Sequence, residues 1–383
     1  MFNRNQGLKG LGRESCFLWG ARQTGKSTLL KRLYPRARVY DLLLSDTFER
    51  LVRRPSLLRE EILAEGGRIH GPVIVDEVQK VPLLLDDIQW LIVNHGVQFI
   101  LSGSSARKLK RGGGNLLGGR ALRYELYPLV SGEIPNFNLL RALNHGLLPR
   151  HYLAEDAQPM VHAYLGDYLK EEIAAEALSR NVPAFARFLE AASFSNGEIV
   201  NYQNVAAECG VSSHTVKEYF QILEDTLLAY SIPSFRKRPK RRVIHAPKFY
   251  FFDVGLANVL LKRGKIAYRG EAFGRAFEHF ILQEIAAHRS YSGLHYPLSY
   301  WRTASQIEVD FILGDAEVAV EIKGTEMAME RHLRGLRAFG EEYKVKKLIA
   351  VSLDARPRSV NGVQVLPWAD FLQRLWGGDI ISG

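Results

Sequence analysis

The chain has 383 residues, of which 46% are hydrophobic, and this is enough for two or three domains that each bury a core. Its formal charge of +10, from 51 Lys and Arg against 41 Asp and Glu, favours polyanionic partners, with nucleic acid first among them. Two cysteines without metal or redox spacing exclude a zinc or disulfide scaffold. The chain has no signal-peptide pattern and no run near ~20 apolar residues, so we expect a cytoplasmic protein.

An apolar segment at 16–19 leads directly into the sequence GARQTGKS at 20–27, and a helical pattern follows at 28–33. This order predicts a phosphate-binding loop, in which backbone N–H groups face the phosphates, Lys26 reaches the outer phosphates and the Ser27 hydroxyl ligates Mg²⁺. We therefore expect ATP and Mg²⁺ as cofactors. The residues expected to contact the nucleotide are Gly20, Ala21, Arg22, Gln23, Thr24, Gly25, Lys26, Ser27 and Thr28.

A second segment, PVIVDE at 72–77, is a short β-branched run that ends in two carboxylates, as expected for a buried parallel strand. We expect Asp76 to hold Mg²⁺ together with Ser27, and Glu77 to orient and polarise the attacking water. Hydroxyl groups follow the next apolar segment. Ser104 is expected to sense the γ-phosphate, with Ser102 as the alternative.

Apolar and helical segments alternate through the first 130 residues, and this predicts a parallel α/β sheet whose active edge lies at the carboxyl ends of the strands. The expected strands are 16–19, 38–42, 73–75 and 98–102, and the expected helices are 28–33, 48–65 and 83–94.

These features resemble the AAA+ ATPases, and more narrowly the prokaryotic ATPases whose C-terminal region was catalogued as a domain of unknown function. The resemblance covers nearly the whole chain. Besides the loop, it rests on DEVQK at 76–80, LSGSS at 101–105, GR at 119–120 before YPL at 127–129, and PKFYFFDVGL at 247–256.

This resemblance implies a homo-oligomer, such as a hexameric ring, in which an arginine of one subunit completes the catalytic site of its neighbour. Arg120 is the expected arginine finger. Arg107 and Arg123 lie nearby in the sequence and are the alternatives.

Helical patterns at 160–177 and 185–192 predict a connector, and the segment 205–220 predicts a helix-turn-helix. Gly210 is placed to make the turn and the serines at 212–213 to cap the second helix. If the unit reads DNA, the side chains of Ser213, His214 and Lys217 would face the major groove. A lid or a protein contact is the alternative.

The densest positive charge follows this unit, with six cations and no acid between them: Arg236, Lys237, Arg238, Lys240, Arg241 and Arg242. Such a cluster favours contact with the phosphates of DNA, whereas a solvated hairpin tip is the alternative. A second basic segment, RKLKRGGG at 107–114, could line a pore or track a phosphate backbone.

The segments 307–313 and 318–324 flank a turn at 314–315 and predict a β-hairpin. Its period of two puts Glu321 and Lys323 on one face and Asp310 on the polar face of the partner strand. Glu278, on an expected helix at 273–286, lies within reach. A polar, solvated hairpin face would explain the same residues without catalysis.

This arrangement resembles the core of the PD-(D/E)xK nucleases. The resemblance implies that Asp310 and Glu321 bind a metal, that Glu278 is an additional acid ligand, and that Lys323 helps to activate water. Because this fold also persists as a binding or structural module, the resemblance leaves cleavage open.

The expected fold class is α/β, with three domains. Residues 1–130 form an AAA+ P-loop core, 131–245 a helical connector with a winged helix-turn-helix, and 246–383 a restriction-endonuclease-like α/β domain. Two functions remain. One is an ATP-driven machine that binds and remodels or moves along DNA; the other is a nucleotide-controlled switch or scaffold for partner proteins.

Overall fold

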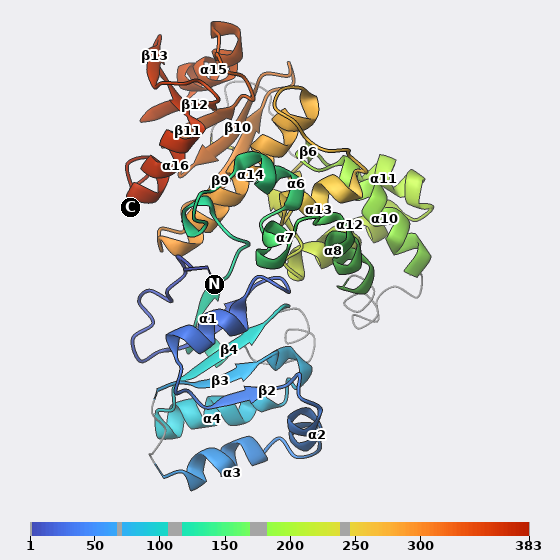
Figure 1. The fold of residues 1–383 in the computed structure, drawn as a ribbon, viewed down its shortest axis with the longest axis vertical. Coiled ribbons are helices and arrows are strands. Elements are labelled where there is room, and N and C mark those ends of the chain that lie inside the picture. Colours follow the sequence, from blue (N-terminus) through green and yellow to red (C-terminus); the bar gives the residue numbers. More distant parts are fainter. Residues whose placement is uncertain (1, 67–70, 106–116, 169–181, 238–245, 383) are drawn as a thin grey trace. The chain divides into compact units, whose positions relative to one another are not determined.

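The computed structural model describes residues 2–66, 71–105, 117–168, 182–237 and 246–382 (Figure 1). The chain divides into two compact units. One comprises Met1–Leu129 and Asp225–Leu228, and the other comprises Val130–Glu224 and Ala229–Gly383. The three-domain division expected from the sequence is a different one and stays a prediction.

The first unit contains a five-stranded sheet in the order β2-β3-β4-β1-β5, in which every neighbouring pair is parallel. The strand β4 separates β1, which leads into the phosphate loop, from β3, which carries the acids. All strands point the same way, so the ends of β1, β3 and β4 meet at one edge. The strands are β1 (Ser15–Trp19), β2 (Val39–Asp41), β3 (Val73–Asp76), β4 (Phe99–Gly103) and β5 (Ala121–Glu125).

Helices cover both faces of this sheet (Figure 1). Alternate residues of the strands, such as Phe17, Val75 and Leu101, share one buried cluster with Ile88 and Leu91. The intervening residues of the three central strands β1, β3 and β4 are also buried, as expected for a parallel sheet covered on both sides. The helices are α1 (Lys26–Leu33), α2 (Ser45–Arg53), α3 (Leu57–Ala64) and α4 (Leu84–His95).

The prediction from the sequence was wrong for one helix of this unit. The single helix expected at 48–65 is two helices, α2 and α3, because Pro55 interrupts it. Proline lacks an N–H donor and disfavours helical backbone in the residue before it. Accordingly, Arg54 has φ −145° and ψ 85° and ends α2.

The second unit begins with a helical region. The pattern at 160–177 is not one helix over its described part, because α8 ends at Ala163 and a π-helical turn, Tyr164–Tyr168, follows; 169–181 lie outside the described residues. The helices are α6 (Leu139–His145), α7 (Pro149–Leu153), α8 (Gln158–Ala163), α10 (Val182–Phe194), α11 (Tyr202–Cys209) and α12 (Ser213–Asp225).

The helix-turn-helix is confirmed as a local structure by α11 and α12. Gly210 makes the turn with φ 65°, a left-handed conformation that glycine adopts at little cost. The Ser212 hydroxyl accepts a hydrogen bond from the backbone N–H of Thr215 at 3.1 Å, which is an N-cap of α12. A small antiparallel sheet, in the order β6-β8-β7, accompanies it and comprises β6 (Glu198–Ile199), β7 (Ala229–Ile232) and β8 (Lys248–Phe251).

The C-terminal part of this unit is a six-stranded mixed sheet in the order β13-β14-β12-β11-β10-β9. Helix α14 contacts β11 and α16, whereas α15 contacts β10, β11 and β12. The strands are β9 (Leu298–Arg302), β10 (Glu308–Leu313), β11 (Val318–Ile322), β12 (Lys347–Ser352), β13 (Arg358–Val360) and β14 (Val363–Pro367). The helices are α13 (Val254–Leu260), α14 (Glu271–Tyr291), α15 (Arg334–Glu342) and α16 (Trp368–Gly377).

The expected hairpin is confirmed, since β10 and β11 pair antiparallel with Phe311 opposite Val320. The alternative of a polar, solvated hairpin face is wrong. Asp310 and Glu321 are each only 6% exposed, because the sheet is covered by helices where the sequence pattern suggested solvent. Among the described residues, no helix is long and apolar enough to cross a membrane.

Candidate functional site

The phosphate loop has the backbone that its glycines permit. Gly25 has φ 96° and Gln23 has φ 63°, so two residues of the loop have a left-handed backbone conformation before α1 begins. A Cβ atom on Gly20 would lie 2.5 Å from the carbonyl oxygen of Leu126, so only glycine fits there. Thr24 closes the loop through a hydrogen bond from Oγ1 to the carbonyl oxygen of Ala21 at 2.8 Å.

Lys26, the first residue of α1, is only 6% exposed. Its Nζ donates to the carbonyl oxygens of Gly20 and Ala21, at 2.7 and 3.2 Å. The ammonium group is therefore held over the loop, at the N-terminal end of a helix, where both the charge and the helix favour an anion.

Ser27 and Asp76 meet at the edge of the sheet. The Ser27 hydroxyl donates to Oδ2 of Asp76 at 2.6 Å, and the Ser102 hydroxyl donates to Oδ1 of the same carboxylate. A hydroxyl and a carboxylate this close are oxygen donors that suit Mg²⁺, which proteins commonly hold through one or two such groups together with substrate phosphates. These residues therefore fit the metal that a bound nucleotide would bring.

Glu77 follows Asp76 in a left-handed backbone conformation, with φ 58° and ψ 42°, which is uncommon for a residue other than glycine and is often found at functional sites. Its carboxylate accepts a hydrogen bond from the amide of Gln79, and the same Nε2 donates to Oγ of Ser104 at 3.2 Å. Gln79 is thus a site residue that the sequence reasoning missed.

Gly103, which ends β4, is the residue that could have indicated Gln79. A Cβ atom on Gly103 would lie 2.3 Å from Oε1 of Gln79, so the strand end keeps space for this amide. The two serines considered as sensors therefore have different partners, because Ser102 contacts Asp76 and Ser104 contacts Gln79.

Arg120 is exposed and directly precedes β5. Because Ala121 pairs with Ser15, whereas Glu125 pairs with Trp19, Arg120 lies at the edge of the sheet opposite to the phosphate loop of its own subunit. Arg123 is also exposed, and Arg107 lies outside the described residues. The role of Arg120 as an arginine finger stays a prediction.

In the C-terminal sheet, the structure brings Asp310, Glu321 and Lys323 together with Glu278 and with three residues that the sequence reasoning did not include. The additional residues are Lys248, Tyr250 and Glu308. Nζ of Lys248 contacts Oε1 of Glu308 and lies 3.5 Å from Glu278 and 3.8 Å from Asp310.

Three further contacts hold the other side chains of this cluster. Nζ of Lys323 lies 2.5 Å from Oε1 of Glu321, and Oδ2 of Asp310 accepts from the backbone N–H of Ile322 at 2.7 Å. The Tyr250 hydroxyl donates to Oε1 of Glu278 at 2.5 Å. Oε2 of Glu321 is buried and has no hydrogen-bond partner.

Burial governs the electrostatics of this cluster. Burial, and next the Asp310 carboxylate, raise the pKa of Glu321; burial also raises the pKa of Glu278, against the opposing effect of Lys248. Burial alone would lower the pKa of Lys248, but the surrounding acids, Glu278 first, outweigh it and hold the pKa well above its ordinary value.

These side chains do not fit a divalent metal as the structure arranges them. The ammonium group of Lys248 lies among three of the acids, in the place where their charges would otherwise hold a metal ion, and it would repel a divalent cation. In the part of the chain that the structure describes, no group of three or more His, Cys, Asp and Glu side chains could hold a metal ion.

The second helix of the helix-turn-helix presents charges of both signs. Ser213, His214, Lys217 and Glu218 are exposed on α12, and Nζ of Lys217 lies 5.4 Å from the ring centroid of Tyr202. Of the basic run, Arg236 and Lys237 are described and exposed, and Lys237 forms an ion pair with Asp315. Arg238, Lys240, Arg241 and Arg242, and the whole basic segment at 107–114, lie outside the described residues.

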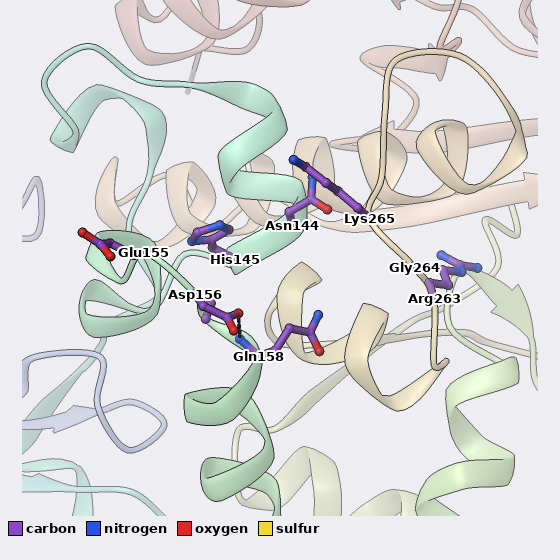
Figure 2. A pocket seen from close by; sticks show the side chains of 9 residues that line it. Asn144, His145, Glu155, Asp156, Gln158, Arg263, Gly264 and Lys265 are labelled. Carbon is purple, nitrogen blue, oxygen red and sulfur yellow. Dashed lines mark hydrogen bonds between the residues drawn. The ribbon is translucent and has the colours of Figure 1, made fainter.

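A separate pocket of about 510 Å³ lies in the second unit, between the end of α6, the segment that follows α7 and the segment that follows α13 (Figure 2). Its lining includes the acids Glu155 and Asp156 and the cations Arg263 and Lys265. None of these residues was expected from the sequence. Because the lining carries both signs of charge without a buried cluster of one kind, we assign it no ligand.

Comparison with known proteins identifies the N-terminal part. Residues 12–134 match the family model of an AAA domain, and 136–266 and 273–371 match two domains of unknown function (DUF8612 and DUF4143). The chain carries an N-terminal AAA-type ATPase domain. That domain implies ATP, in agreement with the loop, and Mg²⁺ with it.

An uncharacterized protein of Haemophilus influenzae is 21% identical over 389 residues, and the match covers 92% of each chain. Among solved structures, the chain is similar to a Walker-type ATPase of Pyrococcus abyssi, with 15% identity, a TM-score of 0.41 and coverage of 64% of this chain and 90% of that one. It is also similar to the ORC1 protein of Aeropyrum pernix, solved in complex with DNA, with 14% identity, a TM-score of 0.21 and coverage of 65% and 86%.

Proposed function

We propose that this protein is a Mg²⁺-dependent ATPase that uses hydrolysis to bind and remodel DNA or to move along it. The observation that carries the proposal is the hydrogen bond between Ser27 and Asp76, which joins the phosphate loop to the acid strand. Lys26 and Glu77 are the residues next to these two in the sequence. In an ATPase of this type the bound metal neutralises charge on the phosphates.

Each residue of the ATPase site has a defined task in this proposal. Lys26 and the backbone N–H groups of the loop bind the phosphates, and Ser27 and Asp76 hold the metal. Glu77 accepts a proton from the attacking water and orients it, while Gln79 keeps the Glu77 carboxylate in place. Arg120 completes the site of a neighbouring subunit, so turnover requires a homo-oligomer.

DNA is proposed as the partner on the ground of charge. The net charge of +10 and the six cations between 236 and 242 favour a polyanion. Arg236 is exposed at the start of this run. Cleavage of DNA is not included in the proposal, because the C-terminal acids do not fit a divalent metal.

The alternative is a nucleotide-controlled switch that binds partner proteins. The exposed face of α12 favours this reading, because it carries His214 and Glu218 beside Lys217 and therefore has little net positive charge for a DNA phosphate backbone.

The deciding experiment measures ATP hydrolysis with and without DNA. We expect duplex or single-stranded DNA to raise kcat, and we expect the rise to disappear at high salt, where DNA contacts weaken. The Glu77→Gln variant gives the background rate. If kcat of the wild-type protein does not change with any DNA form at low salt, the DNA proposal is wrong and the switch is favoured.

A further inference from the structure

The cluster around Lys248 has an unusual composition for a nuclease-like core. The Lys248 side chain is only 3% exposed, and its ammonium group is within 4 Å of Glu278 on α14 and of Glu308 and Asp310 on β10. Convergent carboxylates of this kind normally repel one another unless a cation lies among them. Here the cation belongs to the protein.

The position of the lysine is built into the fold. Lys248 begins β8, and Tyr250, two residues further along the same strand, lies on the same face because the side-chain period of a strand is two. The Tyr250 hydroxyl fixes Glu278 at 2.5 Å. Nζ of Lys248 also lies 5.7 Å from the ring centroid of Tyr300, so that aromatic side chains help to hold the ammonium group.

Three of the other carboxylate oxygens of this cluster are committed to partners of their own. Oε1 of Glu321 pairs with Lys323, and Oε2 of Glu308 lies 3.3 Å from Nη1 of Arg302. Oδ2 of Asp310 is occupied by the backbone N–H of Ile322. A divalent cation would have to displace a buried ammonium group from three acids, and the removal of one partner from a buried charge network is strongly destabilising.

We infer that Lys248 is the built-in cation of this cluster and supplies the positive charge that a divalent metal supplies in a metal-dependent nuclease. The C-terminal domain thus keeps the acids and lysine of a nuclease-like core in a state that neither needs nor binds Mg²⁺ or Mn²⁺. This inference concerns the C-terminal domain alone and does not depend on the ATPase proposal.

The test is a Mn²⁺ titration followed by electron paramagnetic resonance, in which binding removes the signal of the free ion. The full chain is used without nucleotide and with Asp76→Asn, which removes the carboxylate of the N-terminal metal site. We expect no Mn²⁺ to bind this protein at millimolar concentration. Adding Lys248→Met should create one Mn²⁺ site and should make the melting temperature rise by a few degrees on adding Mn²⁺.

The matched control is Lys323→Met, which removes a lysine of the same cluster but leaves the ammonium group of Lys248 among its three acids. This variant should bind no Mn²⁺. If Lys248→Met does not fold, the double variant Lys248→Met with Glu308→Gln removes one charge of each sign and keeps the comparison possible.

Two results would overturn the inference. One is a Mn²⁺ site in the Asp76→Asn protein that disappears when Asp310→Asn is added, because the cluster would then bind a metal despite Lys248. The other is a folded Lys248→Met or double variant that binds no Mn²⁺, because Lys248 would then not be what keeps the metal out.

Discussion

Gln79 and Ser104 are joined by a hydrogen bond of 3.2 Å between Nε2 and Oγ, although 25 positions separate them in the chain. The same nitrogen donates to the carboxylate of Glu77. The acid that is expected to act on water is therefore tied, through one buried amide, to the end of β4. A movement of that strand end would move Glu77 as well.

The first prediction is that Gln79 positions Glu77. Gln79→Leu should lower kcat by about 10²-fold with little change in KM, because a displacement of the catalytic acid by about 1 Å has an effect of this size. Gln79→Glu should also lower kcat, because it replaces the amide donor with a second carboxylate that repels the Glu77 carboxylate. Steady-state kinetics measures both variants. A kcat that neither substitution changes would show that Gln79 does not position Glu77.

The second prediction separates binding from turnover. Lys26→Ala should abolish ATP binding, because it removes the ammonium group held over the phosphate loop. Glu77→Gln should bind ATP but not hydrolyse it, because Ser27 and Asp76 remain to hold the metal. A fluorescent ATP analogue measures the first effect and phosphate release the second. Hydrolysis by Glu77→Gln at the wild-type rate would show that Glu77 is not the catalytic acid.

The third prediction concerns Arg120, which lies at the edge of the sheet away from its own phosphate loop. Arg120→Ala should lower kcat by about 10³-fold, the usual scale of an arginine finger, without loss of ATP affinity. Mixing it with Lys26→Ala protein should restore part of the activity, because each variant supplies what the other lacks. Arg123→Ala, at the exposed arginine of β5 that is the alternative finger, is the matched comparison. Equal losses in both variants would argue against a specific finger.

The fourth prediction tests the basic run. Replacement of Arg236, Arg241 and Arg242 by alanine should weaken binding to every DNA sequence equally and should reduce the salt dependence by about 0.9 log unit per lost duplex contact. Fluorescence anisotropy at several salt concentrations measures both quantities. Lys262→Ala, an exposed lysine outside the run, is the control. An unchanged salt dependence in the triple variant would mean that the basic run is solvated and does not contact DNA.

Much of the first unit was predictable because its signals are local. The phosphate loop, the acid strand and the alternating elements each need only a few adjacent residues to be recognised. The structure places the loop and the end of the acid strand together at one edge of the sheet. The edge strand β5 was not recognised, because its residues are half-buried or exposed and lack an apolar pattern. The break at Pro55 was a local signal that the helical periodicity obscured.

The C-terminal cluster was predictable only in part, because its decisive member comes from another sheet. The period of the hairpin indicates Asp310, Glu321 and Lys323, but nothing in that pattern reports the approach of Lys248 from β8. Another residue of the segment 247–256 has a structural role. Buried Asp253 caps α13 by accepting from the backbone N–H groups of Gly255 and Leu256.

The fifth prediction concerns the buried carboxyl group of Glu284, which is 1% exposed. It accepts hydrogen bonds from the backbone N–H of Ser131 at 2.6 Å and from Nε1 of Trp376 at 2.8 Å. Burial raises its pKa from 4.5 to about 7, more than these two donors lower it; the nearby Glu133 adds to the increase. Because the folded pKa is the higher one, folding favours the protonated form, and this stabilisation is lost as the pH rises from about 4.5 to 7.

We therefore expect wild-type protein to lose about 2 kcal/mol of its free energy of unfolding relative to Glu284→Gln between about pH 5 and pH 8. The comparison with glutamine is needed because His279 and His288, whose pKa burial lowers to about 4, change stability in the opposite direction over part of this range. They contribute equally to both proteins and cancel in the difference. Denaturant unfolding at several pH values measures it. A difference that does not vary with pH would mean that the N–H groups of Ser131 and Trp376 keep Glu284 ionised in the folded protein.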